Sequence, residues 1–590
     1  MIIIFSNNFI NKKIMRMFCF NNVKKISILF IFLFQFLFLY NQSIAQSDTI
    51  ETNVPPLKDV FVNDFSIGCL LSYRHIGFST DEIIPGQSPV VSQNGGNLIK
   101  YHMNCMSPGN NMKPQYTLDI NSSAAAYKSA TTQDAKDSID VHPIVKFPPD
   151  LIAQLNWAKR QNFGFRGHTL VWHSQTPVEF FRSGYTSTGQ RLSKEKMIQR
   201  MDNYIKEIIR LIHESWPNLL IAMDVVNEAI NDNTGTDRTT DSEWYITFGD
   251  NSYIMKAFEI TRKYTIQYGE TQMKLYYNDY NTHNPNKADG IVRICKPIYQ
   301  AGLLDGIGMQ EHDDISYPTA EAWIASYNKF DSVCKEMSVT ELDVTTGSAN
   351  PSSQLLNTQA NQYAMLFKCF VERSYKSGRG KIINVSKDGL NDQYTFKTNQ
   401  SSSLWTSLNK CKPAFYAVVD VGIYFNKLDS LINYAKKLEE KDYTRSSWSL
   451  FQSVLSNSIN IKQKNYSSSV SASSSLKDAY ENLLNAINNL TKATNNIKNN
   501  IELSEYSLSQ NYPNPFNPST KIEYSIPKST NISLKVYNTL GEEVAVIFNG
   551  FRVAGKYTVN FDGSNLPSGV YYYRLITDDY NITRKFVLLK

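Results

Sequence analysis

Two glutamates stand at the ends of short apolar runs that are typical of buried strands. Glu228 closes the run Asp-Val-Val-Asn-Glu, and Glu341 lies far along the chain in Thr-Glu-Leu-Asp-Val. A carboxylic acid can protonate a leaving oxygen, and a carboxylate can attack an anomeric carbon. Two carboxylates on separate strand ends therefore favour cleavage of a glycosidic bond. A separation of ~5–5.5 Å between them would retain the anomeric configuration, and ~6.5–9.5 Å would invert it.

A histidine and a tryptophan share a third apolar run, Arg-Gly-His-Thr-Leu-Val-Trp-His-Ser-Gln-Thr-Pro, which starts at Arg166. On a strand, positions 168 and 172 point the same way, so His168 and Trp172 would offer one pocket a hydrogen-bonding group beside an aromatic face. A purely structural histidine is the alternative. The seven cysteines form no Cys-x-x-Cys pair, and no set of ligands stands at metal spacing. We therefore predict neither a metal nor a cofactor.

Short apolar runs alternate with helical stretches between residues 60 and 421, and these elements must position the polar residues. Eight such units predict a (β/α)₈ barrel, whose active site lies at the C-terminal ends of its strands. A doubly wound open sheet is the alternative, but it would not bring eight strand ends to one pocket. The expected strands are 65–71, 100–106, 163–172, 219–226, 273–278, 306–310, 338–342 and 381–385.

The chain changes character after the barrel. Apolar residues at helical spacing across 427–493 predict a small three-helix module, for which a plain spacer is an equally open interpretation. Residues 494–504 form a polar linker. From 506 to 590, short alternating runs separated by Gly and Pro predict a small β-sandwich, for which a generic fibronectin-like domain is one interpretation.

The N-terminal segment 1–45 has the order of a secretory signal peptide. Lys24 and Lys25 precede an apolar stretch, and Ser43 and Ala45 supply small residues before the expected cleavage at Gln46. A retained membrane anchor is the alternative, although the stretch is short for a membrane span. The net charge of +6 over 590 residues is small, so we expect no nucleic-acid partner.

These motifs, in this order, resemble glycoside hydrolase family 10, the retaining endo-β-1,4-xylanases built on a (β/α)₈ barrel. Tyr-Asn-Asp-Tyr-Asn at 277–281 and Gly-Met-Gln-Glu-His at 308–312 also match. The resemblance implies that Glu228 is the acid/base and Glu341 the nucleophile, with His312 and Asp343 orienting the nucleophile. The sugar-binding residues that it implies are Asn110, Lys113, His168, Trp172, Gln175, Asn227, Asn278, Tyr280 and Gln310.

The chain departs from the family pattern at two places. Gly109 stands where many members have glutamate, and Asp388 stands where a tryptophan normally floors the sugar site. Phe396 follows where a second tryptophan is usual. These changes bear on rate and substrate more than on reaction type, and restoring tryptophan at 388 is expected to strengthen sugar binding.

Two further resemblances concern the C-terminal parts. The helical module resembles the FIVAR module of surface proteins, and Asn-Tyr-Pro-Asn-Pro-Phe-Asn-Pro at 511–518 with the rest of 506–590 closely resembles the sorting domain of type IX secretion cargo. The sequence thus predicts a secreted or surface-displayed endo-1,4-β-xylanase that meets xylan or a related β-1,4-linked plant polysaccharide and the secretion machinery. We expect a monomer. Another β-glycanase specificity, or a carbohydrate-binding surface protein with weakened catalysis, remains open.

Overall fold

The computed structural model describes residues 50–71, 95–463, 476–493 and 505–590. The predicted signal peptide (1–45) and the predicted linker (494–504) lie outside these residues. In the described part, no helix is both long and apolar enough to cross a membrane.

Eight parallel strands close into a barrel, as the sequence predicts. β1 to β6 pair in chain order, β6 pairs with β8, β8 with β9, and β9 returns to β1. The short β7 extends the barrel wall by pairing with β8, where His312 lies opposite Asp343. The strands are β1 (Ser66–Leu71), β2 (Cys105–Pro108), β3 (Gly164–Trp172), β4 (Leu220–Asn227), β5 (Lys274–Asp279), β6 (Gly306–Met309), β7 (His312–Asp314), β8 (Glu336–Thr345) and β9 (Ile382–Asp388).

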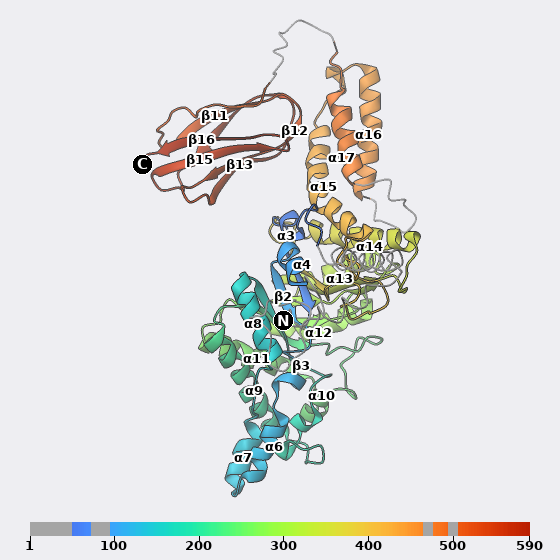
Figure 1. Ribbon diagram of the computed structural model, residues 1–590, viewed down its shortest axis with the longest axis vertical. Coiled ribbons are helices and arrows are strands. Elements are labelled where there is room, and N and C mark those ends of the chain that lie inside the picture. The colour runs from blue at the N-terminus through green and yellow to red at the C-terminus, as the bar shows by residue number, and fades with distance from the viewer. Residues whose placement is uncertain (1–49, 72–94, 464–475, 494–504) are drawn as a thin grey trace, which may run out of the picture. The chain divides into compact units, whose positions relative to one another are not determined.

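Amphipathic helices pack around these strands (Figure 1). α9 illustrates why these helices form and pack. The side chain of Ser193 caps its N-terminus, and the apolar residues that follow at helical spacing are buried. The helices of this part are α3 (Leu57–Val60), α4 (Gly95–His102), α5 (Pro114–Thr117), α6 (Ile120–Ser129), α7 (Gln133–Val141), α8 (Pro149–Gln161), η3 (Val178–Phe181), η4 (Ser183–Tyr185), α9 (Lys194–Ser215), α10 (Glu243–Phe248), α11 (Ser252–Gln267), α12 (Pro285–Gln300), α13 (Ala320–Asp331) and α14 (Ser353–Glu372).

The strand predicted at 100–106 is wrong over its first half. Residues 100–102 complete α4, and β2 begins only at Cys105. Leu98, Ile99 and His102 are all fully buried. Their spacing of one, three and four positions belongs to one face of a helix, which is why the helix extends over these residues.

One helix crosses the predicted border between the barrel and the helical module. α15 (Pro413–Ala435) runs without interruption through positions 421–427. Gly422 does not break it, because it provides room for a neighbour: a Cβ there would stand 2.3 Å from Val60 Cγ1. α16 (Arg445–Gln463) and α17 (Leu476–Asn488) pack beside the second half of α15 (Figure 1).

The C-terminal strands form two antiparallel sheets, one of three strands and one of four, which agrees with the predicted sandwich (red in Figure 1). Their inward side chains, among them Leu534, Tyr573 and Phe586, form a buried core of their own. The strands are β10 (Ser507–Leu508), β11 (Ser519–Ile526), β12 (Thr530–Tyr537), β13 (Glu543–Arg552), β14 (Gly555–Asp562), β15 (Gly569–Thr577) and β16 (Asn581–Leu588).

The six cysteines in the described residues all carry free thiols, and five of them are buried. Burial raises the pKa of Cys105 to about 11 and that of Cys334 and Cys369 to about 12. These thiols therefore stay protonated at neutral pH.

Candidate active site

The two glutamates line one cleft at the C-terminal ends of the barrel strands. Glu228 follows β4 directly, whereas Glu341 lies inside β8, which continues to Thr345 and so does not end at this glutamate as the sequence predicts. The cleft has a volume of about 1050 Å³ and is lined by both side chains. Glu228 has a left-handed backbone with φ of 54°, which turns the chain sharply where the strand ends. Both residues are more than nine-tenths buried, since Glu228 is 9% exposed and Glu341 is 7% exposed.

Neutral donors hold the carboxylate of Glu228 from two sides. Trp172 Nε1 donates to Oε2 at 2.8 Å, and Gln310 Nε2 donates to Oε1 at 2.8 Å. The backbone oxygen of Glu228 accepts from Arg238 Nε at 2.8 Å. The carboxylate and its supporting backbone are therefore both fixed before any ligand arrives.

The environment of Glu341 is positively charged. Its Oε2 lies 3.5 Å from His312 Nε2, and the other ring nitrogen of His312 lies 3.1 Å from Asp343 Oδ2. Burial raises the pKa of Glu341, but the hydrogen bond with His312 and the charges of His168, His312 and Lys113 outweigh it and lower the pKa to about 2. Burial lowers the pKa of His312, yet hydrogen bonds to Asp343 and Glu341 raise it well above its ordinary value. Glu341 is thus held ionised.

An amide network connects the two glutamates beneath the cleft. Asn278 Nδ2 donates to Glu341 Oε1 at 3.1 Å and to Asn227 Oδ1 at 3.0 Å. Gln310 Nε2 also reaches Asn227 Oδ1, at 3.3 Å. Asn227 Nδ2 is buried and has no hydrogen-bond partner in the described residues. This amide nitrogen is therefore a buried donor that the described side chains leave unsatisfied.

Lys113 contacts several polar and aromatic side chains at another wall of the cleft. Its Nζ donates to Asn110 Oδ1 at 2.8 Å and Gln175 Oε1 at 3.0 Å, and lies 4.5 Å from the centroid of the Trp172 ring. His168 lies close by and is oriented by Asp224, 3.0 Å from its Nδ1.

Tyr280 lines the cleft near Glu228. Its hydroxyl accepts from Arg238 at 3.2 Å and donates to Asp232. Arg238 therefore supports both Tyr280 and the backbone of Glu228. Sequence reasoning missed Arg238, because it lies in a loop outside the quoted motifs.

The structure brings most of the predicted residues to the cleft surface. The predicted residues that line it are Asn110, Lys113, His168, Trp172, Glu228, Tyr280, Gln310, His312 and Glu341. Those that lie behind this surface, in contact with the lining residues, are Gln175, Asn227, Asn278 and Asp343.

The Asp388 side chain stabilises a turn, whereas the tryptophan that is usual at this position would form the floor of the cleft. Its Oδ2 accepts from Thr395 Oγ1 at 2.7 Å and from the backbone N–H of Phe396 at 2.6 Å. The Phe396 side chain lines the cleft at 77% exposure, with its ring 5.6 Å from that of His312. Sequence reasoning did not assign Phe396 or Thr395 to the site, because their placement depends on this turn.

The other candidates for the tryptophan's space do not fill it. Trp405 is fully buried against His102, and Lys387 Nζ donates to the backbone oxygens of Asp388 and Gly389 at 2.7 and 2.6 Å. Gly109 lines the cleft with a positive φ of 23°, a conformation that a glutamate would adopt only with strain.

Comparison with known proteins assigns two parts of the chain. Residues 72–421 match glycosyl hydrolase family 10, and residues 510–589 match the secretion system C-terminal sorting domain. The chain is 31% identical over 406 residues to endo-1,4-beta-xylanase Y of Acetivibrio thermocellus, with 66% of this chain and 34% of the relative covered. It is 30% identical over 352 residues to endo-1,4-beta-xylanase B of Butyrivibrio fibrisolvens, with 59% and 52% covered.

The chain thus spans about a third and about half of the length of these two relatives. Among solved structures, it is similar to the CBM22-1–GH10 modules of endo-1,4-beta-D-xylanase 10B from Clostridium thermocellum, complexed with xylohexaose. The TM-score is 0.53 at 31% identity, and 63% of this chain and 69% of that chain are covered.

Proposed function

The chain belongs to glycosyl hydrolase family 10, and we propose that it is a secreted, retaining endo-1,4-β-xylanase that hydrolyses internal bonds of xylan. The similar xylanases named above support the substrate, and the polar and aromatic cleft suits a sugar chain. We also propose that it acts as a monomer, because one chain supplies every residue that lines the cleft.

The unequal surroundings of the two glutamates carry this proposal. Glu341 is kept anionic, with a pKa of about 2, which suits a nucleophile. The hydrogen-bond donors to Glu228, from Trp172 and Gln310, carry no charge, and we assign the acid/base role to this glutamate. Two carboxyl groups with different environments are the usual basis for dividing acid/base and nucleophilic roles.

In the first step, Glu228 protonates the glycosidic oxygen while a carboxylate oxygen of Glu341 attacks C1 of the sugar. The C1–O bond to the leaving chain breaks, and a covalent glycosyl-enzyme forms. In the second step, Glu228 removes a proton from water, the water oxygen attacks C1, and the bond to Glu341 breaks. His312 and Asp343 hold Glu341 in place throughout.

The other polar groups suit sugar recognition. Asn227 Nδ2 is a buried donor whose partner would be a sugar hydroxyl beside the cleaved bond. Asn110, Lys113, Gln175 and His168 would bind the glycone, and Tyr280 would contact the leaving chain. A hydrogen bond to a hydroxyl that strengthens in the transition state contributes to catalysis as well as to binding.

Asp388 is the observation that favours a second candidate, a β-glucanase with the same mechanism. It replaces the ring that floors the sugar site in most family members, so the sugar need not be a xylose. Turnover of xylan and of carboxymethyl-cellulose by the same preparation distinguishes the two. If the protein releases sugar from neither polysaccharide but still binds one of them, it is a carbohydrate-binding protein instead.

Proton NMR of xylohexaose hydrolysis tests the proposal directly. We expect β-anomeric product to appear first and the α-anomer to follow by mutarotation. Glu341→Gln, checked for folding by circular dichroism, is the control and should release no product. Initial α-anomer would contradict the retaining mechanism, and wild-type turnover by Glu341→Gln would contradict the role of Glu341.

The sorting domain at 510–589 directs the protein to the type IX secretion system. A secreted or cell-surface location follows, and it brings the enzyme to a polysaccharide that cannot enter the cell.

A further inference from the structure

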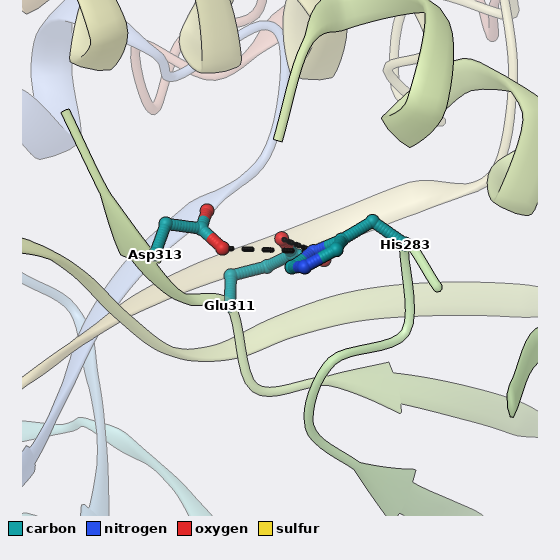
Figure 2. A group of neighbouring side chains, drawn as sticks. All are labelled: His283, Glu311 and Asp313. Carbon is teal, nitrogen blue, oxygen red and sulfur yellow. Dashed lines mark ion pairs between the residues drawn. The ribbon is translucent and has the colours of Figure 1, made fainter. Parts of the chain in front are cut away.

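Three buried titratable side chains gather beside β7, outside the cleft. His283 lies in the loop between β5 and α12, Glu311 lies between β6 and β7, and Asp313 lies on β7. They are 7%, 1% and 2% exposed. Figure 2 shows the imidazole of His283 facing the two carboxylates. Its Nδ1 lies 3.8 Å from Glu311 Oε2 and 3.7 Å from Asp313 Oδ1.

The atoms that face one another lack hydrogen-bond partners among the described residues. These atoms are His283 Nδ1, Glu311 Oε2 and both carboxylate oxygens of Asp313. The other oxygen of Glu311 accepts from Thr282 Oγ1 at 3.1 Å and Trp323 Nε1 at 3.2 Å. Those bonds fix the carboxylate so that its free oxygen stays directed at His283.

The positively charged side chain near this group, that of Lys397, bonds to other atoms. Lys397 Nζ lies 3.2 Å from Asp343 Oδ1 and donates to the backbone oxygen of Asp313, also at 3.2 Å. The Asp313 carboxylate therefore has no hydrogen bond from this lysine. Burying a carboxylate oxygen without a partner is costly. Asp313 has two such oxygens and Glu311 has one, so the two carboxylates beside one imidazole favour a compensating charge.

We propose that His283, Glu311 and Asp313 bind a divalent metal ion, and that the donor set selects zinc. One imidazole nitrogen and carboxylate oxygens are ligands that Zn²⁺ accepts, whereas Ca²⁺ takes 6–8 oxygens. One ligand atom from each residue lies within 4.8 Å of the other two. Ligand atoms of a tetrahedral zinc site stand about 3.3 Å apart, so the 3.7 and 3.8 Å separations need only a small contraction.

The ion has a structural role. Side chains alternate along a strand, so on β7 His312 points away from the side occupied by Asp313. The same short segment is hydrogen-bonded to β8, because the backbone N–H of Asp343 donates to the backbone oxygen of Glu311 at 3.1 Å. A metal bound to His283 would tie the loop after β5 to the segment that carries His312. Sequence reasoning predicted no metal because His283 is distant in sequence from Glu311 and Asp313.

Zinc content and thermal stability test the proposal. The full chain is purified without a histidine tag, stripped with EDTA, and exchanged into metal-free buffer. We expect Zn²⁺ added alone to bind at one ion per chain by calorimetry and elemental analysis. It should also raise the Tm of the barrel by several degrees, because an ion that binds only the folded state stabilises it.

Isosteric variants locate the ion. Asp313→Asn and His283→Gln should lose zinc binding and the zinc-dependent rise in Tm. His213→Gln is the matched control, since His213 pairs with a single carboxylate among the described residues, that of Glu270 at 3.0 Å. This variant should bind zinc like the wild type. Zinc bound equally by Asp313→Asn, or a wild-type Tm that zinc does not change, overturns the proposal.

The alternative occupant is a proton shared by the two carboxylates. In that case Asp313→Asn raises the Tm in EDTA and wild-type protein binds no zinc, which also overturns the proposal. If the variants do not fold, X-ray absorption at the zinc edge of the wild type decides. One imidazole with oxygen ligands supports the site, and a spectrum without imidazole overturns it.

Discussion

At the residue scale, the two active-site carboxylates differ in the charge around them. Glu341 faces His312, His168 and Lys113, while the hydrogen-bond donors to Glu228 are uncharged. One buried cleft therefore holds two carboxyl groups in unequal surroundings, to which we assign the nucleophilic and the acid/base roles. The two predictions at this scale separate these roles.

Glu228→Ala should lower kcat on xylan by about 10²–10⁴-fold, the usual contribution of a general acid/base. The first step on a dinitrophenyl xylobioside should be much less affected, because an acidic phenol leaves without a proton. Steady-state kinetics on both substrates and the size of the burst of phenol check this. Azide should then restore turnover and give a β-glycosyl azide. Equal losses on both substrates would mean that Glu228 only binds sugar.

In the pH profile of kcat/KM, the acidic limb, where activity falls as the pH is lowered, should lie well below pH 4. The pKa of Glu341 is lowered from 4.5 to about 2, so the nucleophile stays ionised until the pH falls near that value. Lys113→Met removes one positive charge and should move this limb to higher pH. Lys556→Met, on β14, should leave it unchanged. Circular dichroism at each pH excludes acid unfolding, and an unmoved limb in Lys113→Met would show that its charge does not act on Glu341.

Sequence motifs predicted the residues that sit at strand ends better than those that act from loops. Glu228 and Glu341 could be placed because a barrel brings all strand ends to one pocket. Arg238 and Phe396 could not, since each reaches the site only through a fold-dependent loop contact. The network from Asn278 to Asn227 likewise depends on the register of neighbouring strands.

At the element scale, the turn after β9 replaces an aromatic floor with a hydrogen-bonded loop. Asp388 accepts two hydrogen bonds from the segment that carries Phe396. The expectation that tryptophan at 388 improves binding therefore changes once the turn is known, because a ring cannot accept these bonds.

Asp388→Trp and Asp388→Ala should each lower kcat/KM on xylohexaose by about tenfold or more, since each lost hydrogen bond contributes about 0.5–1.5 kcal/mol. Asp388→Asn keeps an acceptor oxygen and should stay within a few-fold of wild type. Phe396→Ala should raise KM with a smaller effect on kcat. A gain in kcat/KM for Asp388→Trp would show that the ring, and not the turn, limits binding.

Periodicity located most elements but not their limits. All eight barrel strands lie close to their expected positions, because short apolar runs between helices have few other interpretations. The start of β2 was missed, since only two residues separate the end of α4 at His102 from the first strand residue, Cys105. The length of α15 was missed because the apolar residues before 421 and after 427 were assigned to two different parts, whereas one helix carries both and Gly422 within it lets Val60 approach.

At the scale of the whole molecule, catalysis and export belong to separate parts of the chain. Every residue that lines the cleft falls between Leu70 and Thr398. The C-terminal sheets have their own buried core, which includes Leu534 and Phe586. A part with its own core can be removed without taking core residues from the rest.

Deleting residues 506–590 should leave xylanase activity and the Tm of the barrel nearly unchanged in recombinant protein. In a host with type IX secretion, the same deletion should retain the enzyme in the periplasm. Cell fractionation and activity assays check both results. Surface display of the truncated enzyme would contradict the sorting role, and a large fall in the Tm would mean that the sandwich stabilises the barrel.

The free, buried thiols determine how this enzyme responds to the redox state of its surroundings. A thiol with a raised pKa is a poor nucleophile, so in the folded protein it resists oxidation and disulfide exchange. The described part of the fold therefore requires no disulfide isomerase and tolerates reductant. Its vulnerable period is the interval after export and before burial, when unfolded thiols meet an oxidant. In the described residues, burial and not covalent cross-linking protects these thiols once the enzyme has folded.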